Sequence, residues 1–511
     1  DTTIVEKYSK QDQKVLKKTE APENNIESET LVVDGGSYVA QINNLAGGSI
    51  FSFNLKKHLK SSEESLDLID NQNKKNLVVS FINQSGEVVV LDELWSIVSG
   101  GSVVLSEENS SSSMVFETAY MGQPVTKKLT FYYNSYEVDV DVSLREIKES
   151  SLDEKYILSW IGGLPEHEGS QDAMFMEGLV SQVGSIESFR VGSAGFFGSS
   201  NTKSISEDTK RYVGLVDFAG YRTKYFGVFF VPQKSDMVEL YKYPSLSRAG
   251  VDINITQDIN LEKNKLYLGP LDYTSVEALG VGLEEKILGW QWLSSVSWLV
   301  YSIMILLYGL IPNYGVVVVL FAVLIKLVTY PLMAKQLRSS KKMQEISPIM
   351  NNIKIKYKNN PTLQQQKMAA LFQEHKINPL AGCLPLLIQM PVLMSVFMVF
   401  RNTIEFRGES FVFWINDLSA ADTLFSVSGV PINILPFLMS ASMYYTMKLS
   451  SASQPAGGDP AQEATQQMMK YMFPGMMFFL FYSFPSGLNL YYLCFNIMQI
   501  AQQKIINNEK S

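Results

Sequence analysis

One apolar run in the second half of the chain is long enough to cross a lipid bilayer as a helix. It extends from Asn313 to Leu332 and carries a single charged residue, Lys326. A bilayer core of about 30 Å requires roughly 20 apolar residues in a helix, and a lysine inside such a span costs roughly 2.5–3.5 kcal/mol on insertion scales. The lysine either snorkels toward the nearer end of the helix or occupies a polar site between helices.

Four more apolar segments follow and are predicted to be further spans: Leu384–Phe400, Pro431–Met447, Tyr471–Phe484 and Ser486–Ile500. A shorter uncharged run, Val296–Ile311, precedes the first span and lies among the tryptophans 290, 292 and 298. Aromatic side chains of this kind prefer the membrane–water interface. The run is either a short span or a helix that lies in the interface. We favour the interface and therefore expect five spans after it.

Residues 31–285 have the short alternating patterns of β-strands. In Tyr136–Leu144, four apolar side chains alternate with polar ones, which indicates one buried face. Lys128–Tyr133 is predicted to pair with it through a turn at Asn134–Ser135. Further expected strands are Leu31–Val33, Tyr38–Ile42, Ile50–Phe53, Leu77–Phe81, Val88–Leu91, Met114–Glu117, Tyr225–Val231 and Lys265–Leu268. The pattern predicts a large antiparallel β-sandwich.

Charge is divided unevenly along the chain. Of the 43 basic and 51 acidic residues, 16 and 9 lie from Ile287 onward, which leaves a net charge of −15 before that point and +7 after it. Nine basic and two acidic residues lie in 333–382, so the positive-inside rule places this loop in the cytoplasm. Counting spans from there places 401–430 and the β domain outside and the C-terminus inside. We expect an exported β domain of this kind to need a signal or anchor helix upstream of residue 1.

The chain is thus predicted to contain a linker at 1–30, a β-sandwich domain at 31–285, an interfacial helix at 286–312, a helical membrane core at 313–507 and a tail at 508–511. The core spans are expected at about 313–332, 384–400, 431–447, 471–484 and 486–500, with a cytoplasmic helical hairpin at 333–382.

The cytoplasmic hairpin is expected to pack through two apolar stripes. Met343, Ile346, Met350, Ile353 and Tyr357 follow heptad spacing, and Met368, Leu371 and Phe372 form the facing stripe. Its lysines either fix topology alone or form a docking arm for anionic headgroups, a ribosome or a targeting factor; the residues proposed for docking are Lys341, Lys342, Lys354, Lys356 and Lys358.

Polar and methionine side chains inside the spans are the remaining candidates for function. Gln389, Asn489 and Asn496 either line a cavity together with Lys326 or form hydrogen bonds between helices. Methionines recur at helical spacing in the second and fourth of the five spans, among them Met390, Met394, Met398, Met472 and Met476. They are either packing residues or an adaptable apolar surface along which a client helix slides.

No enzyme chemistry is indicated. The motifs GxxxxGK[ST], HExxH and GxSxG are absent. His58 and His167 are far apart and unaccompanied, so no metal site or cofactor is expected. We also expect no nucleic-acid binding.

Several segments resemble the YidC membrane protein insertase family. The most specific are NPLAGCLPLLIQMP at 378–391, FWINDL at 413–418 and FPSGLNLYY at 484–492. In the β domain, NLAGGS at 44–49 and YLGP at 267–270 are similar to the family's Gram-negative periplasmic domain. The family prefers arginine at the position of Lys326 and a threonine at that of Ala322, and its late aromatic in the last span falls on Tyr492.

The resemblance implies a multi-pass protein of the bacterial inner membrane with a periplasmic β-sandwich. Its function would be to move hydrophobic segments of nascent membrane proteins from the cytoplasm into the membrane through a hydrophilic groove, alone or with the Sec translocon. The groove residues would be Lys326, Gln389, Tyr492 and Asn496, in contact with clients and membrane lipids. The alternatives are a membrane-anchored β-sandwich binding protein and a small secondary transporter.

Overall fold

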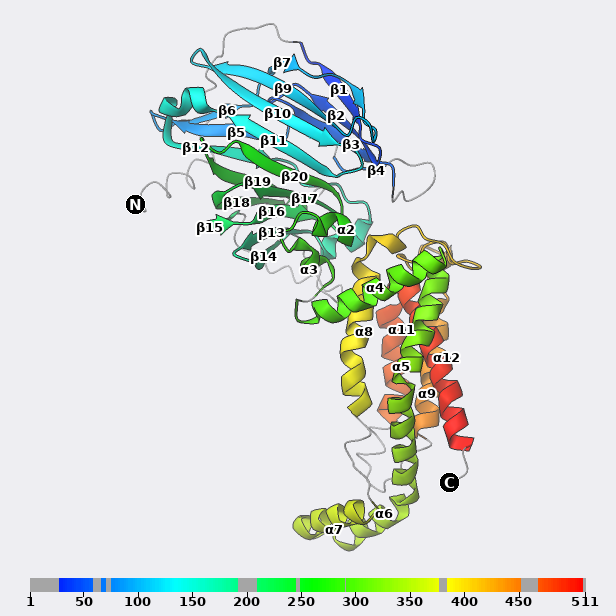
Figure 1. The fold of residues 1–511 in the computed structure, drawn as a ribbon. Helices are drawn as coiled ribbons and strands as arrows, with labels where there is room; N and C mark the ends of the chain where they lie inside the picture. The colour runs from blue at the N-terminus through cyan, green and yellow to red at the C-terminus, as the bar shows by residue number, and fades with distance from the viewer. Residues whose placement is uncertain are drawn as a thin grey trace.

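The computed structural model of the chain describes residues 27–57, 66–69, 75–191, 209–244, 249–289, 291–375, 384–451 and 467–508. A β-rich region lies at one end, a bundle of long helices follows it, and a helical hairpin lies beyond the far end of the bundle (Figure 1). The predicted fold class, a β-sandwich followed by a helical region, is confirmed. The count of five spans stays a prediction.

Three large sheets make up the described part of the β region, and their pairing is antiparallel except between β1 and β8. The first has the order β4-β3-β2-β1-β8 and consists of β1 (Thr30–Asp34), β2 (Tyr38–Asn43), β3 (Ser49–Leu55), β4 (Leu66–Asp67) and β8 (Val103–Val104).

The second sheet runs through the middle of the region in the order β14-β13-β16-β17-β20-β11-β10-β9-β7. Its strands are β7 (Ser96–Ser99), β9 (Ser111–Tyr120), β10 (Gln123–Tyr132), β11 (Glu137–Ser143), β13 (Glu177–Gln182), β14 (Ser185–Arg190), β16 (Phe218–Arg222), β17 (Phe226–Pro232) and β20 (Lys263–Pro270).

The third sheet has the order β15-β18-β19-β12-β5-β6. It consists of β5 (Val78–Asn83), β6 (Val88–Leu91), β12 (Ser151–Trp160), β15 (Thr209–Val216), β18 (Ser235–Pro244) and β19 (Ala249–Asp258). Side chains from all three sheets share one apolar core, in which Trp95 and Trp160 are fully buried.

The alternating strand expected at 136–144 is β11, and Val138, Val140 and Val142 are fully buried on its inner face. It pairs with β10 as predicted, through a turn in which Asn134 has a φ of 51°. Strands β12, β13, β16, β18 and β19 were not predicted. All five residues of β16 are buried, so that strand has no alternation to detect.

Two short helices lie within the β region, η1 (Arg145–Ser150) and η2 (Gly169–Met174). Three more short helices then lead into the bundle: α2 (Tyr273–Glu277), α3 (Leu283–Ile287) and η3 (Gln291–Leu293). Helix α4 (Ser294–Leu310) then lies across the outer ends of the long helices (Figure 1). Its Tyr301 hydroxyl donates to Glu405 Oε1 at 2.6 Å, and burial raises the pKa of Glu405 to about 7. This bond joins α4 to the short helix η5 (Ile404–Phe406).

The bundle consists of α5 (Tyr314–Glu345), α8 (Leu384–Asn402), α9 (Leu435–Ser451), α11 (Phe473–Phe481) and α12 (Ser486–Asn508), with a π-helical turn, η6 (Met468–Met472), before α11. Among the described helices α5 is the one that is long and apolar enough to cross a membrane, over Tyr314–Lys335. Two shorter apolar helices are Ser294–Leu310 and Met390–Asn402.

Helix α5, which contains the first expected span, continues through Pro331 to Glu345 and extends beyond the rest of the bundle (Figure 1). Where the span ends within this helix stays a prediction. One predicted boundary is wrong. The third span was expected to begin at Pro431, but residues 430–433 form strand β22 and α9 begins at Leu435. The carboxylate of Asp422 accepts hydrogen bonds from the N–H groups of Ile434 and Leu435, which starts the helix at that point.

A buried ion pair joins the β region to the bundle. Arg407, which follows η5, donates from Nε to Glu168 Oε1 at 2.7 Å, and the side chains are 1% and 11% exposed. Beside it, the Arg401 guanidinium lies 4.8 Å from the ring centroid of Phe175. Separating the two surfaces would leave each charge without its partner, and a buried charge without a partner is costly. We therefore expect the pair to hold the two surfaces together.

We therefore expect Arg407→Met to loosen this junction. Breaking a buried pair costs about 3–5 kcal/mol, so the backbone amides of η2 and η5 should exchange hydrogen faster, while those in β10 and β11 should not change. The measurement is hydrogen exchange by mass spectrometry on the full chain in detergent.

Lys155→Met is the matched control, because the Lys155–Asp236 pair has the same N–O type of contact but is 38% and 57% exposed. An exposed pair is worth about 0–1 kcal/mol. Equal exchange in the two variants would show that the Arg407 pair does not hold the junction.

Candidate functional site

Lys326 is buried between two helices of the bundle. It lies on α5 facing α12 and is 5% exposed. Its Nζ donates a hydrogen bond to Oε1 of Gln499 and lies 4.8 Å from the ring centroid of Phe495. Phe495 and Gln499 are four residues apart on α12, so one face of that helix presents both an aromatic ring and an amide oxygen to the ammonium.

The partner of this lysine is a neutral group. Among the described residues no carboxylate forms an ion pair with Lys326; the amide oxygen and the ring supply its close contacts. These dipolar contacts offset part of the cost of burying a positive charge but do not neutralise it. A buried cation with these contacts is a candidate site for an anionic group.

Other polar side chains on α12 bond to the two neighbouring helices. Asn496 donates from Nδ2 to Ser442 Oγ on α9 at 3.3 Å. Gln502, which is 4% exposed, donates to the carbonyl of Tyr330 on α5 at 3.3 Å. Helix α12 thus packs between α5 and α9 through amide side chains, and we call Lys326, Ser442, Asn496, Gln499 and Gln502 the polar cluster.

Of the two roles left open for Asn489, the structure shows the hydrogen bond between helices: its Nδ2 donates to the carbonyl of Phe481 at the end of α11. Tyr492 packs edge-on against the Phe481 ring, with centroids 5.1 Å apart. The side chain of Gln389, on α8, lies outside the described residues. Gln499, which the sequence reading missed, is the direct partner of Lys326.

The outer half of the bundle, toward the β region, is filled by aromatic rings. Contacting pairs are Phe321–Tyr491, Phe397–Phe484, Phe400–Phe406 and Phe481–Tyr492, with centroid distances of 6.0, 5.4, 4.8 and 5.1 Å. One of these pairs is stacked, one is edge-on and two are tilted, so the rings form a largely apolar region. The polar cluster therefore lies below an apolar layer that separates it from the β region.

The predicted methionines divide into two groups. Met390, Met472 and Met476 are about half exposed, at 48%, 53% and 50%. Met394 is partly buried, and Met398 is 7% exposed and packs against Gly289. The exposed methionines are therefore Met390 on the inner part of α8, Met472 at the end of η6 and Met476 on α11.

The hairpin beyond the bundle consists of α6 (Ser347–Lys356) and α7 (Pro361–Glu374). Its predicted apolar packing is confirmed, because Ile346 and Leu371 are buried among Met343, Met350, Ile353, Met368 and Phe372. Tyr357 instead ends α6. Lys342, Lys356 and Lys358 are exposed and Lys354 is partly buried; the side chain of Lys341 lies outside the described residues.

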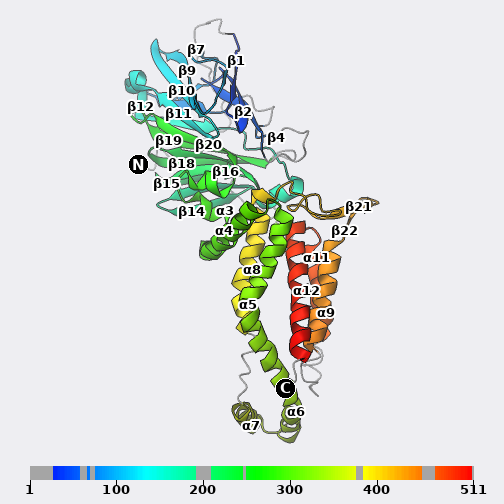
Figure 2. The same ribbon diagram turned by 45° about the vertical axis from the view of Figure 1, so that its right-hand side comes forward.

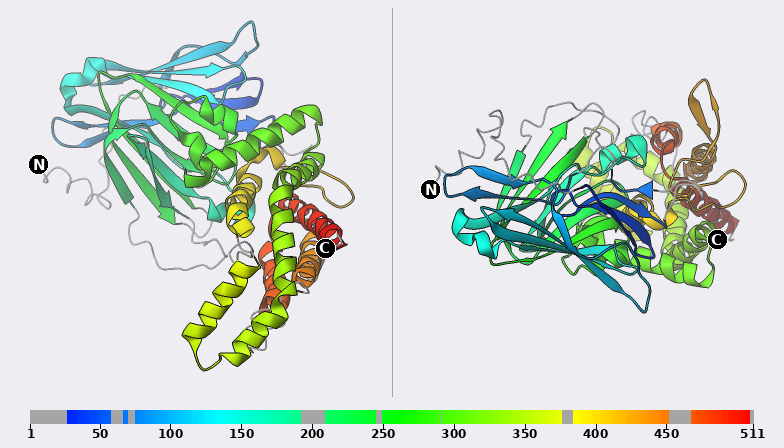
Figure 3. Two further views of the ribbon diagram at one scale, coloured as in Figure 1. Left: turned by 60° about the horizontal axis from the view of Figure 1, so that its bottom comes forward. Right: turned by 90° about the horizontal axis from the view of Figure 1, so that it is seen from above.

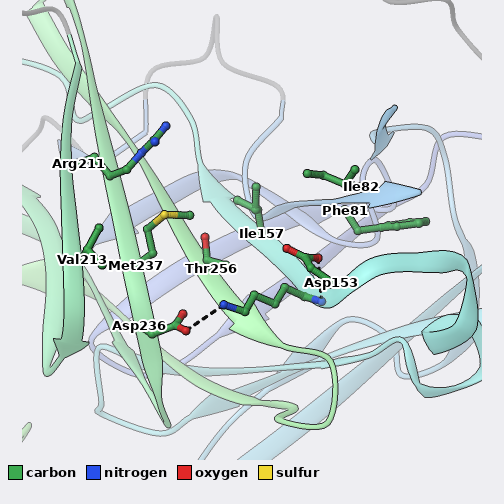
Figure 4. A pocket seen from close by; sticks show the side chains of 10 residues that line it. Phe81, Ile82, Asp153, Ile157, Arg211, Val213, Asp236, Met237 and Thr256 are labelled. Atoms are coloured by element: carbon green, nitrogen blue, oxygen red, sulfur yellow. Dashed lines mark hydrogen bonds and ion pairs between the residues drawn. The ribbon is translucent and has the colours of Figure 1, made fainter. Parts of the chain in front are cut away.

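The β region contains a cavity of about 210 Å³ on the third sheet, lined by Phe81, Ile82, Asp153, Lys155, Ile157, Arg211, Val213, Asp236, Met237 and Thr256 (Figure 4). Two of its charged lining residues are in ion pairs: Lys155 with Asp236 at 2.9 Å and Arg211 with Glu239 at 3.0 Å. It is smaller than most small-molecule sites, which occupy roughly 300–1,000 Å³. The described residues also contain no cluster of three or more metal-ligating side chains.

Comparison with known protein families covers both regions. A family model described as "YidC periplasmic domain" matches residues 30–301, and one described as "60Kd inner membrane protein" matches residues 306–511. The first match alone spans more than half of the chain. The chain belongs to the YidC membrane protein insertase family.

Relatives in this family are similar along nearly the whole chain. The membrane protein insertase YidC of Prosthecochloris aestuarii is 32% identical over 95% of this chain and 84% of its own length. That of Chlorobaculum parvum is 32% identical over 93% and 82%. A YidC insertase crystal structure with the first transmembrane domain resolved covers 95% of both chains at 20% identity, with a TM-score of 0.36, which is too low to add to the assignment.

Family membership confirms three predictions. The chain is a membrane protein insertase, it is not an enzyme, and it is an inner-membrane protein with a periplasmic domain. The β region is that periplasmic domain. Family membership does not identify the residues that contact clients, so a role for the polar cluster is inferred from its geometry alone.

The Lys326–Gln499 pair predicts a specific pattern of stabilities. Gln499→Leu removes the acceptor and leaves a buried ammonium, which costs about 1–3 kcal/mol or more. The double variant Lys326→Leu/Gln499→Leu removes both polar groups and should recover most of the loss. The measurement is the thermal midpoint of helical circular dichroism in detergent. A double variant less stable than Gln499→Leu would contradict the pairing.

Proposed function

We propose that this insertase works by holding the polar or acidic flank of an incoming segment at the polar cluster while the apolar part of that segment passes into lipid. The observation that carries the proposal is Lys326, a buried cation whose partner is an amide oxygen. An acidic client side chain would give this cation the opposite charge that it lacks.

The magnitude of this attraction is sufficient to matter. Two unit charges 4 Å apart attract by about 4 kcal/mol at an effective dielectric constant of 20. The interaction offsets part of the cost of taking a charged flank out of water. No covalent step is involved: burial of apolar surface supplies about 25 cal/mol per Å², and the membrane potential adds roughly 2.3 kcal/mol per charge per 100 mV.

The path of the client follows from the asymmetry of the bundle. The aromatic layer between the cluster and the periplasmic domain favours exit sideways rather than outward. We propose that the client slides along α8 and α11, where Met390, Met472 and Met476 are exposed. Met394 and Met398 continue this line toward the outer end of α8, and Tyr492 and Gln389 complete the proposed groove. Flexible thioether side chains adapt to many client sequences.

The orientation we propose is multi-pass, with five spans corresponding to α5, α8, α9, α11 and α12. The basic hairpin lies in the cytoplasm and the β domain in the periplasm. In this orientation Lys326 lies just on the cytoplasmic side of the middle of the apolar span Tyr314–Lys335, the side from which nascent chains arrive.

The partners we propose follow from charge and position. The hairpin lysines, Lys341, Lys342, Lys354, Lys356 and Lys358, would receive clients by contacting anionic headgroups, a ribosome or a targeting factor. The periplasmic domain would contact the Sec translocon. The protein would then act alone on some clients and with the translocon on others.

Lys326→Ala should reduce insertion of clients with acidic translocated tails by at least about tenfold, the equivalent of 1.4 kcal/mol. Lys326→Arg should insert them normally, because the charge is retained. The measurement is protease protection of the translocated tail in proteoliposomes that contain the purified variant.

The same client with its acidic residues replaced by Asn or Gln provides the control, since it should be much less sensitive to Lys326→Ala. Normal insertion of the acidic client by Lys326→Ala would refute the role of the charge. Equal loss with both clients would point to a folding defect instead.

A further inference from the structure

The loop between α8 and α9 carries a small β-hairpin whose strands pair with no other strand in the described part of the chain. Strands β21 (Thr423–Val427) and β22 (Val430–Asn433) form a separate two-stranded sheet. The turn residues Ser428 and Gly429 both have positive φ, 51° and 82°, as in the turns that favour tight hairpins. A two-stranded hairpin is marginally stable in water without a surface to cover it.

The side chains on this hairpin are unsuited to water. Leu424, Phe425, Val427 and Val430 are 46%, 52%, 54% and 56% exposed. No charged residue occurs from Thr423 to Met447, although charged side chains commonly guard exposed edge strands. The hairpin thus presents apolar side chains and bare strand edges together.

An aromatic residue in the same loop is also exposed. Phe413 is 90% exposed and has a φ of 58°, a conformation that costs energy for a bulky side chain. The next residue, Trp414, donates from Nε1 to Asp422 Oδ2 at 3.0 Å. We call Phe413, Leu424, Phe425, Val427 and Val430 the apolar rim.

The base of the hairpin is fixed to the bundle. The same Asp422 carboxylate accepts from the N–H groups of Ile434 and Leu435, at 2.9 and 2.6 Å. Asn433 donates to the carbonyl of Tyr482, just after α11, at 2.6 Å. The hairpin is therefore attached to the outer ends of α9 and α11.

Its position matches that of α4. Figure 2 shows β21 and β22 projecting sideways from the outer end of the bundle, on the side away from α4 and at about the same level. The view from above in Figure 3 shows the hairpin extending away from the helices. Helix α4 exposes Trp298, Leu306 and Leu310, at 48%, 67% and 73%, a composition typical of a membrane interface. Two apolar elements thus flank the bundle in one plane.

We propose that the apolar rim lies in the interfacial zone of the outer leaflet, where lipid headgroups meet acyl chains. Lipid is favoured as its occupant because the rim is uncharged, continuous with the outer ends of the helices and level with α4. Together with α4, the rim sets the depth of α9 and α11 in the bilayer. This inference rests on the proposed multi-pass orientation.

The test places a fluorescent probe on the rim of the full chain. In a background of Cys383→Ser and Cys494→Ala, the single-cysteine variants Phe425→Cys and Leu424→Cys are labelled with an environment-sensitive fluorophore. The protein is reconstituted in vesicles of phosphatidylethanolamine and phosphatidylglycerol. Quenching is then compared between lipids that carry a nitroxide near the glycerol end of the acyl chain and iodide in the aqueous phase.

Two control positions calibrate the result. Ser85→Cys lies in an exposed turn of the periplasmic domain, and Phe479→Cys lies on α11, where the side chain is 78% exposed. The rim probes should be quenched by the lipid nitroxide several-fold more than the Ser85 probe and by iodide several-fold less.

Rim probes that behave like the Ser85 probe would overturn the inference, as would rim probes shielded from both quenchers, which would indicate a protein cover. If the probe at position 479 is quenched by the lipid nitroxide and the rim probes are not, the inference about the rim is refuted and the multi-pass orientation is retained. Absence of lipid quenching at position 479 as well refutes the multi-pass orientation and the inference with it.

Discussion

The hydrogen bond between Lys326 and Gln499 is the interaction on which the rest of the membrane core depends. A lysine between two long helices must keep its polar contacts within the protein, because hydrocarbon offers none. An amide oxygen meets that need without cancelling the charge, whereas a carboxylate would form a closed pair. The cation is therefore held in place and remains attractive to anions. The family prefers arginine at this position. Lysine suits the single acceptor that Gln499 offers, whereas the planar fork of arginine carries several donors that would each need a partner.

The surroundings of this pair give the bundle a direction. Amide side chains of α12 bond to α5 and α9 on the inner side, while aromatic rings fill the side toward the periplasmic domain. The buried Arg407–Glu168 pair and the Tyr301–Glu405 bond fix the outer ends of the helices to the β domain and to α4. A rigid outer end and a polar inner end are the arrangement expected of a groove that accepts substrates from one side only.

Sequence patterns were sufficient for the architecture and for the central residue. The apolar run around Lys326, the alternation in β11 and the hairpin stripes at Met343 to Phe372 all correspond to structure. Strands buried on both faces, such as β16, lack alternation and were missed. Polarity within a span left two roles open for Asn489, and only the helix register decides between them by directing its amide to Phe481. Gln499 had a signal that was overlooked: with Gln502 and Gln503 it forms a polar stripe at helical spacing on the inner part of the last helix.

The central claim is that a client's polar flank enters the bundle beside Lys326, beneath the aromatic layer. Photo-crosslinking of a ribosome-stalled client to a benzophenone side chain at Ser442, in the polar cluster, or at Phe400, in the aromatic layer, tests it most directly. The account predicts crosslinks to the client's polar flank at position 442 and few at position 400. Crosslinks to that flank at position 400 with none at position 442 would contradict it.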